Sequence, residues 1–183
     1  MLGASTPPHL GGHLSKTHVD RGALEWIRDT YKVSSMIDIG CGPGGMREVA
    51  ESIGITWYGV DGDPAVATPK SGIALHDFTI GPHSRSEKFD LAWSVEFLEH
   101  VSEGYLPNYM ELFSKCRIVA ATAAPPGYPG HHHVNCRGLE YWQGAFAANG
   151  FRFSAAATAA LRDASTMQKP FMQSTGMIFE KYA

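Results

Sequence analysis

Several features are scarce in this 183-residue sequence, and each scarcity excludes a class of protein. The three cysteines, Cys41, Cys116 and Cys136, are odd in number and widely spaced, which fits neither a disulfide framework nor a cysteine metal site. A reducing compartment suits them best. No apolar run is long enough to span a bilayer, and the first residues lack the apolar core of a signal peptide. We therefore expect a cytoplasmic protein without a membrane partner.

A strong charge of either sign is also missing. Lys and Arg number 15 against 18 Asp and Glu, so the net charge is -3. Dedicated nucleic-acid binders are usually basic, so composition gives no electrostatic case for RNA or DNA. Hydrophobic residues make up 44%, as in ordinary globular proteins. We expect an irregular arm over residues 1–18, rich in Gly, Pro and His, and one domain over residues 19–183.

Strand-like and helix-like segments alternate along most of the chain. Apolar runs predict strands at 33–40, 55–61, 72–78, 89–95, 117–124, 151–161 and 174–182. Helical spacing predicts helices after Asp20 as N-cap and at 45–53, 103–116 and 138–150. This alternation predicts an α/β fold with a mostly parallel sheet of seven strands and helices on both faces. Because no full helix is expected between the last two strands, they should form an antiparallel hairpin.

A glycine-rich turn, DIGCGPGG at 38–45, lies between the first strand and the next helix. Glycines allow a sharp turn and close approach to a ligand. Gly40, Gly42 and Gly45 also satisfy G-x-G-x-x-G, with Asp61 at the spacing of a ribose-binding acid, so a nicotinamide dinucleotide is one interpretation. Asp38 argues against it, because a carboxylate beside the turn repels a pyrophosphate. The same carboxylate attracts the ammonium and sulfonium of S-adenosylmethionine.

Four segments in order resemble the motifs of class I S-adenosylmethionine-dependent methyltransferases. They are MIDIGCGPGG, YGVDGDP, LHDF and FDLAWSVEFLEHV, and the resemblance covers residues 20–182. It implies a Rossmann-like fold, with S-adenosylmethionine at the carboxyl ends of the first strands.

The resemblance also implies roles for individual residues. Asp61 would hold the two ribose hydroxyls, Asp77 and Phe78 would contact adenine, and Arg21 would pair with the methionine carboxylate. The full set of cofactor-binding candidates is Arg21, Asp38, Gly40, Gly42, Gly44, Asp61, Gly62, Asp77, Phe78 and Ser94.

Two acids and a histidine follow the fourth strand. If this segment is helical, Glu96, Glu99 and His100 share one face and suit Mg²⁺, Mn²⁺ or Zn²⁺. The pattern E-x-x-E-H resembles two metal-using methyltransferase families. One acts on the 2′-hydroxyl at the 3′ end of small RNAs and the other on phenolic hydroxyls in ubiquinone biosynthesis. In the RNA family a further histidine, from the loop after the fifth strand, completes the site. The candidate ligands here are Glu96, Glu99, His100, His132 and His133.

The same pattern also occurs in methyltransferases thought to use no metal, where the acids cap a helix. In that case a histidine of the triplet His131, His132 and His133 is the candidate general base. With a metal, Lewis-acid activation of the acceptor hydroxyl is expected instead.

Two further groups have alternative interpretations. His13, His18 and Arg21 belong either to a solvated arm, which we favour slightly, or to a segment that covers the cofactor. Tyr128, Tyr141 and Trp142 either wall an acceptor pocket or, for the last two, belong to the core.

The favoured function is methyl transfer to a hydroxyl of a small molecule or sugar, with or without a divalent metal. The length leaves little room for a substrate domain, which favours a compact acceptor. Three alternatives stay open: an RNA 2′-O-methyltransferase, a nicotinamide-dependent oxidoreductase, and a non-catalytic cofactor-binding partner of another methyltransferase.

Overall fold

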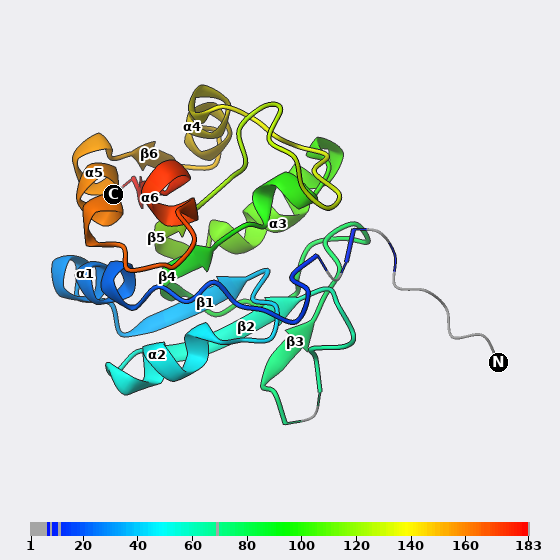
Figure 1. Cartoon of the computed structure of the whole chain (residues 1–183), viewed down its shortest axis with the longest axis horizontal. Helices are drawn as coiled ribbons and strands as arrows, with labels where there is room; N and C mark the ends of the chain where they lie inside the picture. Colours follow the sequence, from blue (N-terminus) through cyan, green and yellow to red (C-terminus); the bar gives the residue numbers. More distant parts are fainter. Residues whose placement is uncertain (1–6, 8, 11, 69, 183) are drawn as a thin grey trace.

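The computed structural model describes residues 7, 9–10, 12–68 and 70–182 (Figure 1). Within these residues seven strands form one sheet, in the order β3-β2-β1-β4-β5-β7-β6. They are β1 (Ser35–Ile39), β2 (Thr56–Asp61), β3 (Ile73–Leu75), β4 (Phe89–Ser94), β5 (Cys116–Ala121), β6 (Phe151–Phe153) and β7 (Met177–Lys181). The first five strands pair in parallel, and β7 runs antiparallel to both of its neighbours. The predicted fold class is confirmed.

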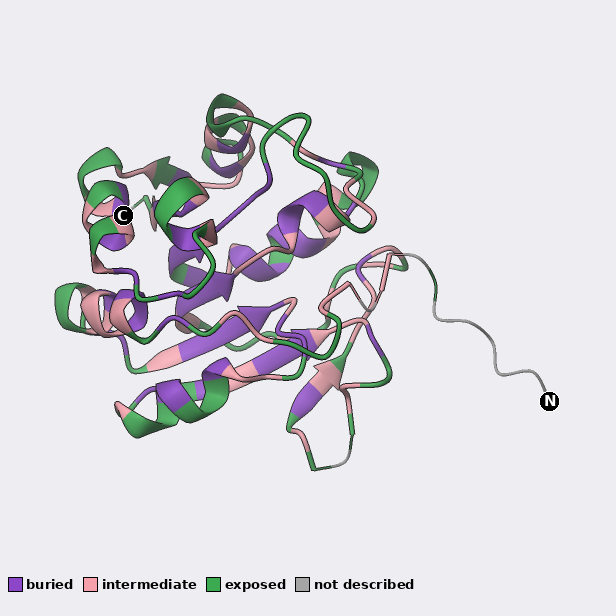
Figure 2. Cartoon of the chain, in the orientation of Figure 1, coloured by how far each residue is buried: buried purple, intermediate pink, exposed green. Residues whose placement is uncertain are grey.

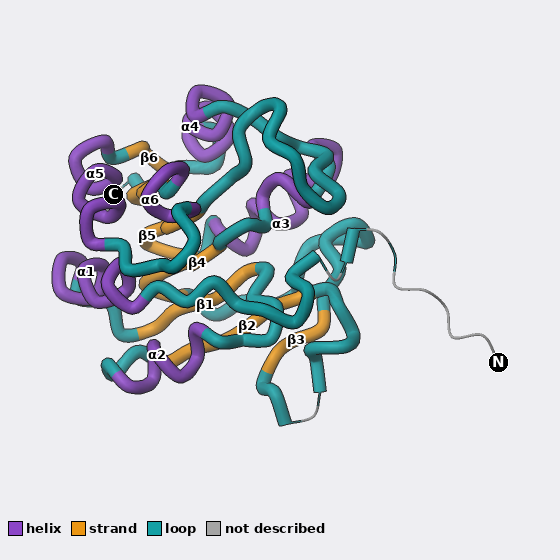
Figure 3. Tube along the Cα trace, viewed as in Figure 1, coloured by secondary structure: helices purple, strands orange, loops and turns teal. Residues whose placement is uncertain are grey.

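Helices cover both faces of the sheet and are joined to it by loops (Figure 3). One face packs against α1 (Arg21–Tyr31), α2 (Met46–Ser52), α5 (Ala155–Ala164) and α6 (Phe171–Thr175). The other face packs against α3 (Leu106–Phe113) and α4 (Leu139–Ala147). Two short 3₁₀ turns, Leu98–His100 and Glu103–Tyr105, precede α3. Burial is concentrated in the strands and on the inner sides of the helices (Figure 2).

The predicted start of α1 at Asp20 is confirmed. The Asp20 carboxylate accepts a hydrogen bond from the Ala23 N–H at 3.1 Å, which satisfies a free donor of the first turn. It also accepts one from the Thr166 N–H at 2.9 Å. One buried cap therefore ties α1 to the segment that follows α5.

The strand predicted over 151–161 is wrong beyond Phe153. Residues Ala155–Ala164 form α5 instead. The apolar run continues past Phe153, but five of the six residues from 155 to 160 are alanine, the residue with the highest helix propensity. Because α5 and α6 lie between β6 and β7, the two strands pair antiparallel without a tight hairpin turn.

The acidic residues predicted from the motifs lie at the carboxyl ends of the parallel strands. Asp38 lies near the end of β1 and Asp61 at the end of β2. Open α/β sheets bind ligands at this edge. In the part of the chain that is described, no helix is long and apolar enough to cross a membrane.

Candidate functional site

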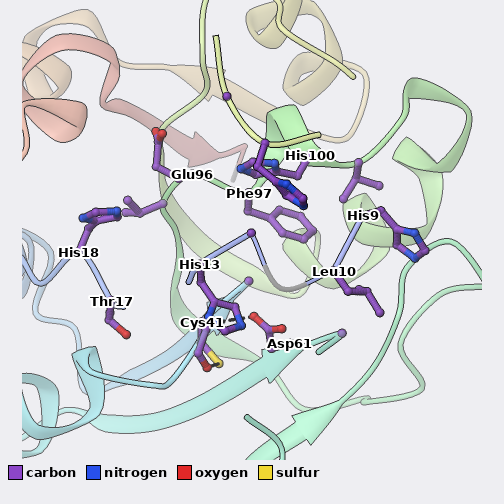
Figure 4. Close-up of a pocket in the computed structure, with 18 of the residues that line it drawn as sticks. His9, Leu10, His13, Thr17, His18, Cys41, Asp61, Glu96, Phe97 and His100 are labelled. Carbon is purple, nitrogen blue, oxygen red and sulfur yellow. Dashed lines mark hydrogen bonds between the residues drawn. The ribbon is translucent and has the colours of Figure 1, made fainter. Parts of the chain in front are cut away.

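A cavity of about 450 Å³ opens at the carboxyl ends of β1, β2 and β4 (Figure 4). Its size falls within the roughly 300–1,000 Å³ typical of small-molecule sites. The glycine-rich turn, the ends of the strands, residues 9–10 and 12–18 of the arm and the loop at 128–133 all contribute to its walls.

Asp38 lies in the wall of this cavity and is 2% exposed. Its carboxylate accepts a hydrogen bond from the Trp57 indole N–H at 3.1 Å. Burial raises the pKa of Asp38 to about 7, and the nearby Asp61 adds to the shift. A cation that entered the cavity would therefore be the natural partner of this carboxylate.

Asp61 is held in place by the backbone of two turns. Its two carboxylate oxygens accept hydrogen bonds from the N–H groups of Gly42 and Asp63, both at 2.8 Å. Burial raises its pKa despite these donors. Each carboxylate oxygen can accept more than one hydrogen bond, so Asp61 can still bind two adjacent hydroxyls.

Asp77 and Phe78 lie side by side in the lining. Partial burial opposes ionisation of Asp77, but hydrogen bonds from His9 and Thr79 outweigh it and lower its pKa. Phe78 is 4% exposed, and its ring packs edge-on against Phe97 with centroids 5.7 Å apart. A flat apolar surface next to a hydrogen-bond acceptor suits a heteroaromatic ring that carries an amino group.

The predicted glycines fall into two groups. Gly40, Gly42 and Gly62 line the cavity. Gly40 has φ +73°, and a Cβ there would lie 2.6 Å from the Phe97 ring, so only glycine fits. Gly44 also has a positive φ but packs against Trp57, outside the cavity lining that the structure describes.

Two other cofactor candidates also lie outside the described lining. Ser94 is fully buried and donates a hydrogen bond to the carbonyl of Ile39 at 3.0 Å. Arg21 is exposed on α1, where it donates to Glu25 and to the Ser52 hydroxyl. The structure therefore does not bring Arg21 to the cavity, and it gives Ser94 a structural bond.

The N-terminal arm covers the cavity, so the slight preference for a solvated arm is wrong for His13 and His18 (Figure 4). The His9 and His13 rings contact Asp77 at 2.8 Å and Asp63 at 3.1 Å. His18 packs edge-on against Phe171, and burial lowers its pKa. Side-chain contacts of His9 and His13 therefore hold the arm against the ends of the strands. Sequence patterns did not predict these pairs, because the partners are far apart in the chain.

A compact group of ligand atoms lies beyond the end of β4, where His100 and His133 also line the cavity. One ligand atom each from Glu99, His100 and His133 lies within 4.8 Å of the others. Glu99 is fully buried and accepts from the Ala124 N–H through Oε1, but its Oε2 has no hydrogen-bond partner among the residues that are described. Burial, reinforced by Glu96, raises the pKa of Glu99. Two neighbouring buried acids need a shared proton or a cation between them, so Glu99 and Glu96 can accommodate one.

The two histidines of this group are oriented by their surroundings, and burial keeps His100 neutral. Burial lowers the pKa of His100 to about 4, and the neighbouring His133 adds to the shift. The His133 Nδ1 lies 3.0 Å from the carbonyl of Tyr128. Such a bond uses the Nδ1 proton, which leaves the Nε2 lone pair available.

Glu96 does not share a helical face with Glu99 and His100, because only Leu98–His100 is helical. It has a left-handed φ of +54°, which is unusual for a glutamate. The buried Thr122 holds it: the Thr122 hydroxyl accepts from the Glu96 N–H at 2.8 Å and donates to Glu96 Oε1 at 3.0 Å. Sequence reasoning missed Thr122, whose signal was a single hydroxyl among the alanines that end and follow β5.

The three histidines of the triplet do not all face the cavity. His131 and His133 line the cavity, whereas His132 lies outside its described lining, with its ring 6.1 Å from that of His9. The predicted ligand His132 is therefore not part of the group of three ligand atoms in the described chain.

The three aromatic residues near the triplet also lie in different places. Tyr128 lines the cavity. Trp142 is 1% exposed within the core, and the Tyr141 hydroxyl donates to Glu103 at 3.0 Å. Of the three aromatic residues considered for an acceptor pocket, Tyr128 alone lines this cavity within the described structure.

Known proteins resemble this chain in the segment that contains β1, β2, β4 and β5. The family model described as "Methyltransferase domain" matches residues 37–121. A search of curated proteins gave no match.

Many solved structures share the fold. The magnesium protoporphyrin IX methyltransferase ChlM from Synechocystis PCC 6803, with bound SAH, is 17% identical with a TM-score of 0.59, over 86% of this chain and 78% of that one. The methyltransferase domain of bacterial CtHen1-CN is 15% identical with a TM-score of 0.57, over 88% and 97%. The sugar N-methyltransferase KedS8 from Streptoalloteichus sp ATCC 53650 is 11% identical with a TM-score of 0.63, over 88% and 87%. At these identities the likeness concerns the fold.

Proposed function

We propose that this chain is a class I S-adenosylmethionine-dependent methyltransferase and that it methylates a hydroxyl of a small molecule or sugar with the help of a divalent cation. The observation that carries the proposal is the unpartnered Oε2 of the buried Glu99, grouped with His100 and His133.

The large cavity supports S-adenosylmethionine as the donor. Asp61 offers a carboxylate to the ribose hydroxyls, while Asp77 and Phe78 offer an acceptor and an apolar surface to adenine. Asp38 supplies negative charge for the cationic methionine end. A nicotinamide dinucleotide would instead bring its pyrophosphate to this carboxylate, so the same geometry disfavours the oxidoreductase alternative.

The group formed by Glu99, His100 and His133 supports a divalent cation. One carboxylate and two imidazoles suit Zn²⁺ or Mn²⁺ better than Mg²⁺, which prefers oxygen ligands. When bound there, the cation would supply Lewis-acid activation of the acceptor hydroxyl.

Nearby side chains would then position the acceptor and accept its proton. Glu96 lines the large cavity close to this group, and Thr122 fixes its orientation. His131 also lines the cavity and is our candidate general base. His133 holds its Nδ1 against the Tyr128 carbonyl, which keeps the ring oriented.

The test compares Glu99→Gln with Glu140→Gln. Both substitutions remove one carboxylate charge, but Glu140 is exposed at the start of α4. Metal content would be measured by mass spectrometry of the native protein purified without chelator, and S-adenosylmethionine affinity by calorimetry. We expect wild type and Glu140→Gln to carry one divalent ion, and Glu99→Gln to lose it while keeping its affinity for S-adenosylmethionine.

Different results would contradict the metal and the methyl donor. Full transfer activity in the presence of a strong chelator would contradict the metal. Failure of the wild-type chain to bind S-adenosylmethionine would contradict the methyl donor, whatever the metal content.

A further inference from the structure

A second, smaller cavity of about 130 Å³ lies beside the large one. Its walls come from the segment after β5 and from the start of α6, which are far apart in the sequence. Glu96, Tyr128 and Phe171 line both cavities. The small cavity is therefore a side pocket of the same cleft.

The lining of the side pocket is mostly apolar. Ala124, Pro125, Pro170, Phe171 and the Tyr128 ring provide most of its walls. The Thr175 hydroxyl also lines it but is engaged, since it donates to the carbonyl of Phe171 at 3.0 Å.

Charge restricts what the pocket can accept. Glu96 is its acidic residue, and none of the described residues that line it is a lysine or arginine. The proposed cation would be occupied by the acceptor hydroxyl, so a further phosphate or carboxylate in the side pocket would meet Glu96 with no lysine or arginine of the described lining to compensate it, which is unfavourable in a partly buried site. The occupant should be neutral and should offer one hydrogen-bond donor to Glu96.

The volume of the side pocket also limits which molecule it can hold. A cavity of about 150 Å³ with apolar walls holds a benzene molecule, so about 130 Å³ suits one ring. Tyr128 and Phe171 present aromatic surfaces, against which a flat ring packs in offset or edge-on geometry.

We propose that this side pocket is the acceptor subsite, and that it takes a single neutral aromatic ring whose hydroxyl points to Glu96. The inference rests on the proposed function, since it names the class of acceptor for the same transfer. The ring would sit between Pro125 and Phe171, on the side of Glu96 where the small cavity lies.

The test fills the pocket from its exposed side. Ser174 lines the pocket and is exposed on α6, so Ser174→Phe adds a ring there without disturbing the core. Gln173→Phe adds the same ring at the neighbouring exposed position, outside the described lining, and is the matched control. Phenol is the probe and benzoate the anionic comparison. Binding is followed by ligand-detected NMR, and transfer by mass spectrometry of the methyl ether.

We expect phenol to bind wild type and Gln173→Phe alike, and Ser174→Phe to weaken it at least tenfold with unchanged S-adenosylmethionine affinity. The inference is overturned if phenol does not bind, if Ser174→Phe binds it as wild type does, or if benzoate binds equally well. The results that would refute the acceptor subsite differ from those that would refute the proposed function. If the protein methylates another hydroxyl but ignores phenol, only the subsite is refuted, whereas a protein that does not bind S-adenosylmethionine refutes the proposed function.

Discussion

Asp38 gives the sharpest prediction, because its raised pKa makes its charge depend on pH near neutrality and its carboxylate lies in the wall of the cavity. Its pKa is raised to about 7 mainly by burial. A cationic ligand beside it favours the ionised form, so binding should strengthen as pH rises through 7. With a pKa of about 7, about three quarters of Asp38 would be ionised at pH 7.5 and about 3% at pH 5.5. Affinity for S-adenosylmethionine should therefore fall about 25-fold between them, roughly 1.9 kcal/mol.

The assay is calorimetric titration of S-adenosylmethionine at both pH values, for wild type and Asp38→Asn. The amide keeps an acceptor for the Trp57 N–H but cannot ionise. Other groups of the cavity titrate in both proteins, so the difference between the two profiles isolates Asp38. Thermal unfolding at each pH confirms that both proteins are folded. Parallel profiles, with the same loss of affinity in Asp38→Asn, would refute the reasoning.

Other substitutions test separate parts of the site and the core. Asp61→Ala should weaken S-adenosylmethionine at least about tenfold in calorimetry, because hydrogen bonds to a charged group contribute about 1.5–3 kcal/mol, and unchanged affinity would disprove its ribose role. Thr122→Val should lower turnover several-fold without changing donor affinity, because Glu96 loses two hydrogen bonds, and Thr122→Ser should restore it; equal loss in both would indicate a packing effect. Phe146→Ala should lower the free energy of unfolding by about 3–5 kcal/mol in urea titration, since Phe146 is buried and stacked on Phe179; a loss below about 1 kcal/mol would contradict this.

The architecture of the N-terminal two thirds was predictable from the sequence, because apolar runs there end in acids at regular intervals. Asp38 lies next to the end of β1 and Asp61 ends β2, and the glycine-rich turn that follows β1 contains glycines with a positive φ. After Phe153 the local sequence pattern did not predict the structure. The alanine-rich segment forms α5 where a strand was expected.

The candidate site was only partly predictable, because its decisive contacts join distant segments. The motif predicted Glu99 and His100, but the choice of His133 over His132 depends on a loop in which His132 has φ +48°. Nor could pattern show that Thr122 orients Glu96, because that pair is 26 residues apart and depends on the register of the sheet.

The order of the strands also has a consequence for synthesis of the chain. β7 pairs between β5 and β6, although it follows both in sequence. Until Met177–Lys181 has left the ribosome, β5 has an open edge and β6 lacks its partner in the described sheet. Ile118 and Val119 of that open edge are apolar and become buried in the finished sheet. A nascent chain that stalls before Met177 therefore exposes a template for aggregation, which chaperones would have to cover until translation resumes.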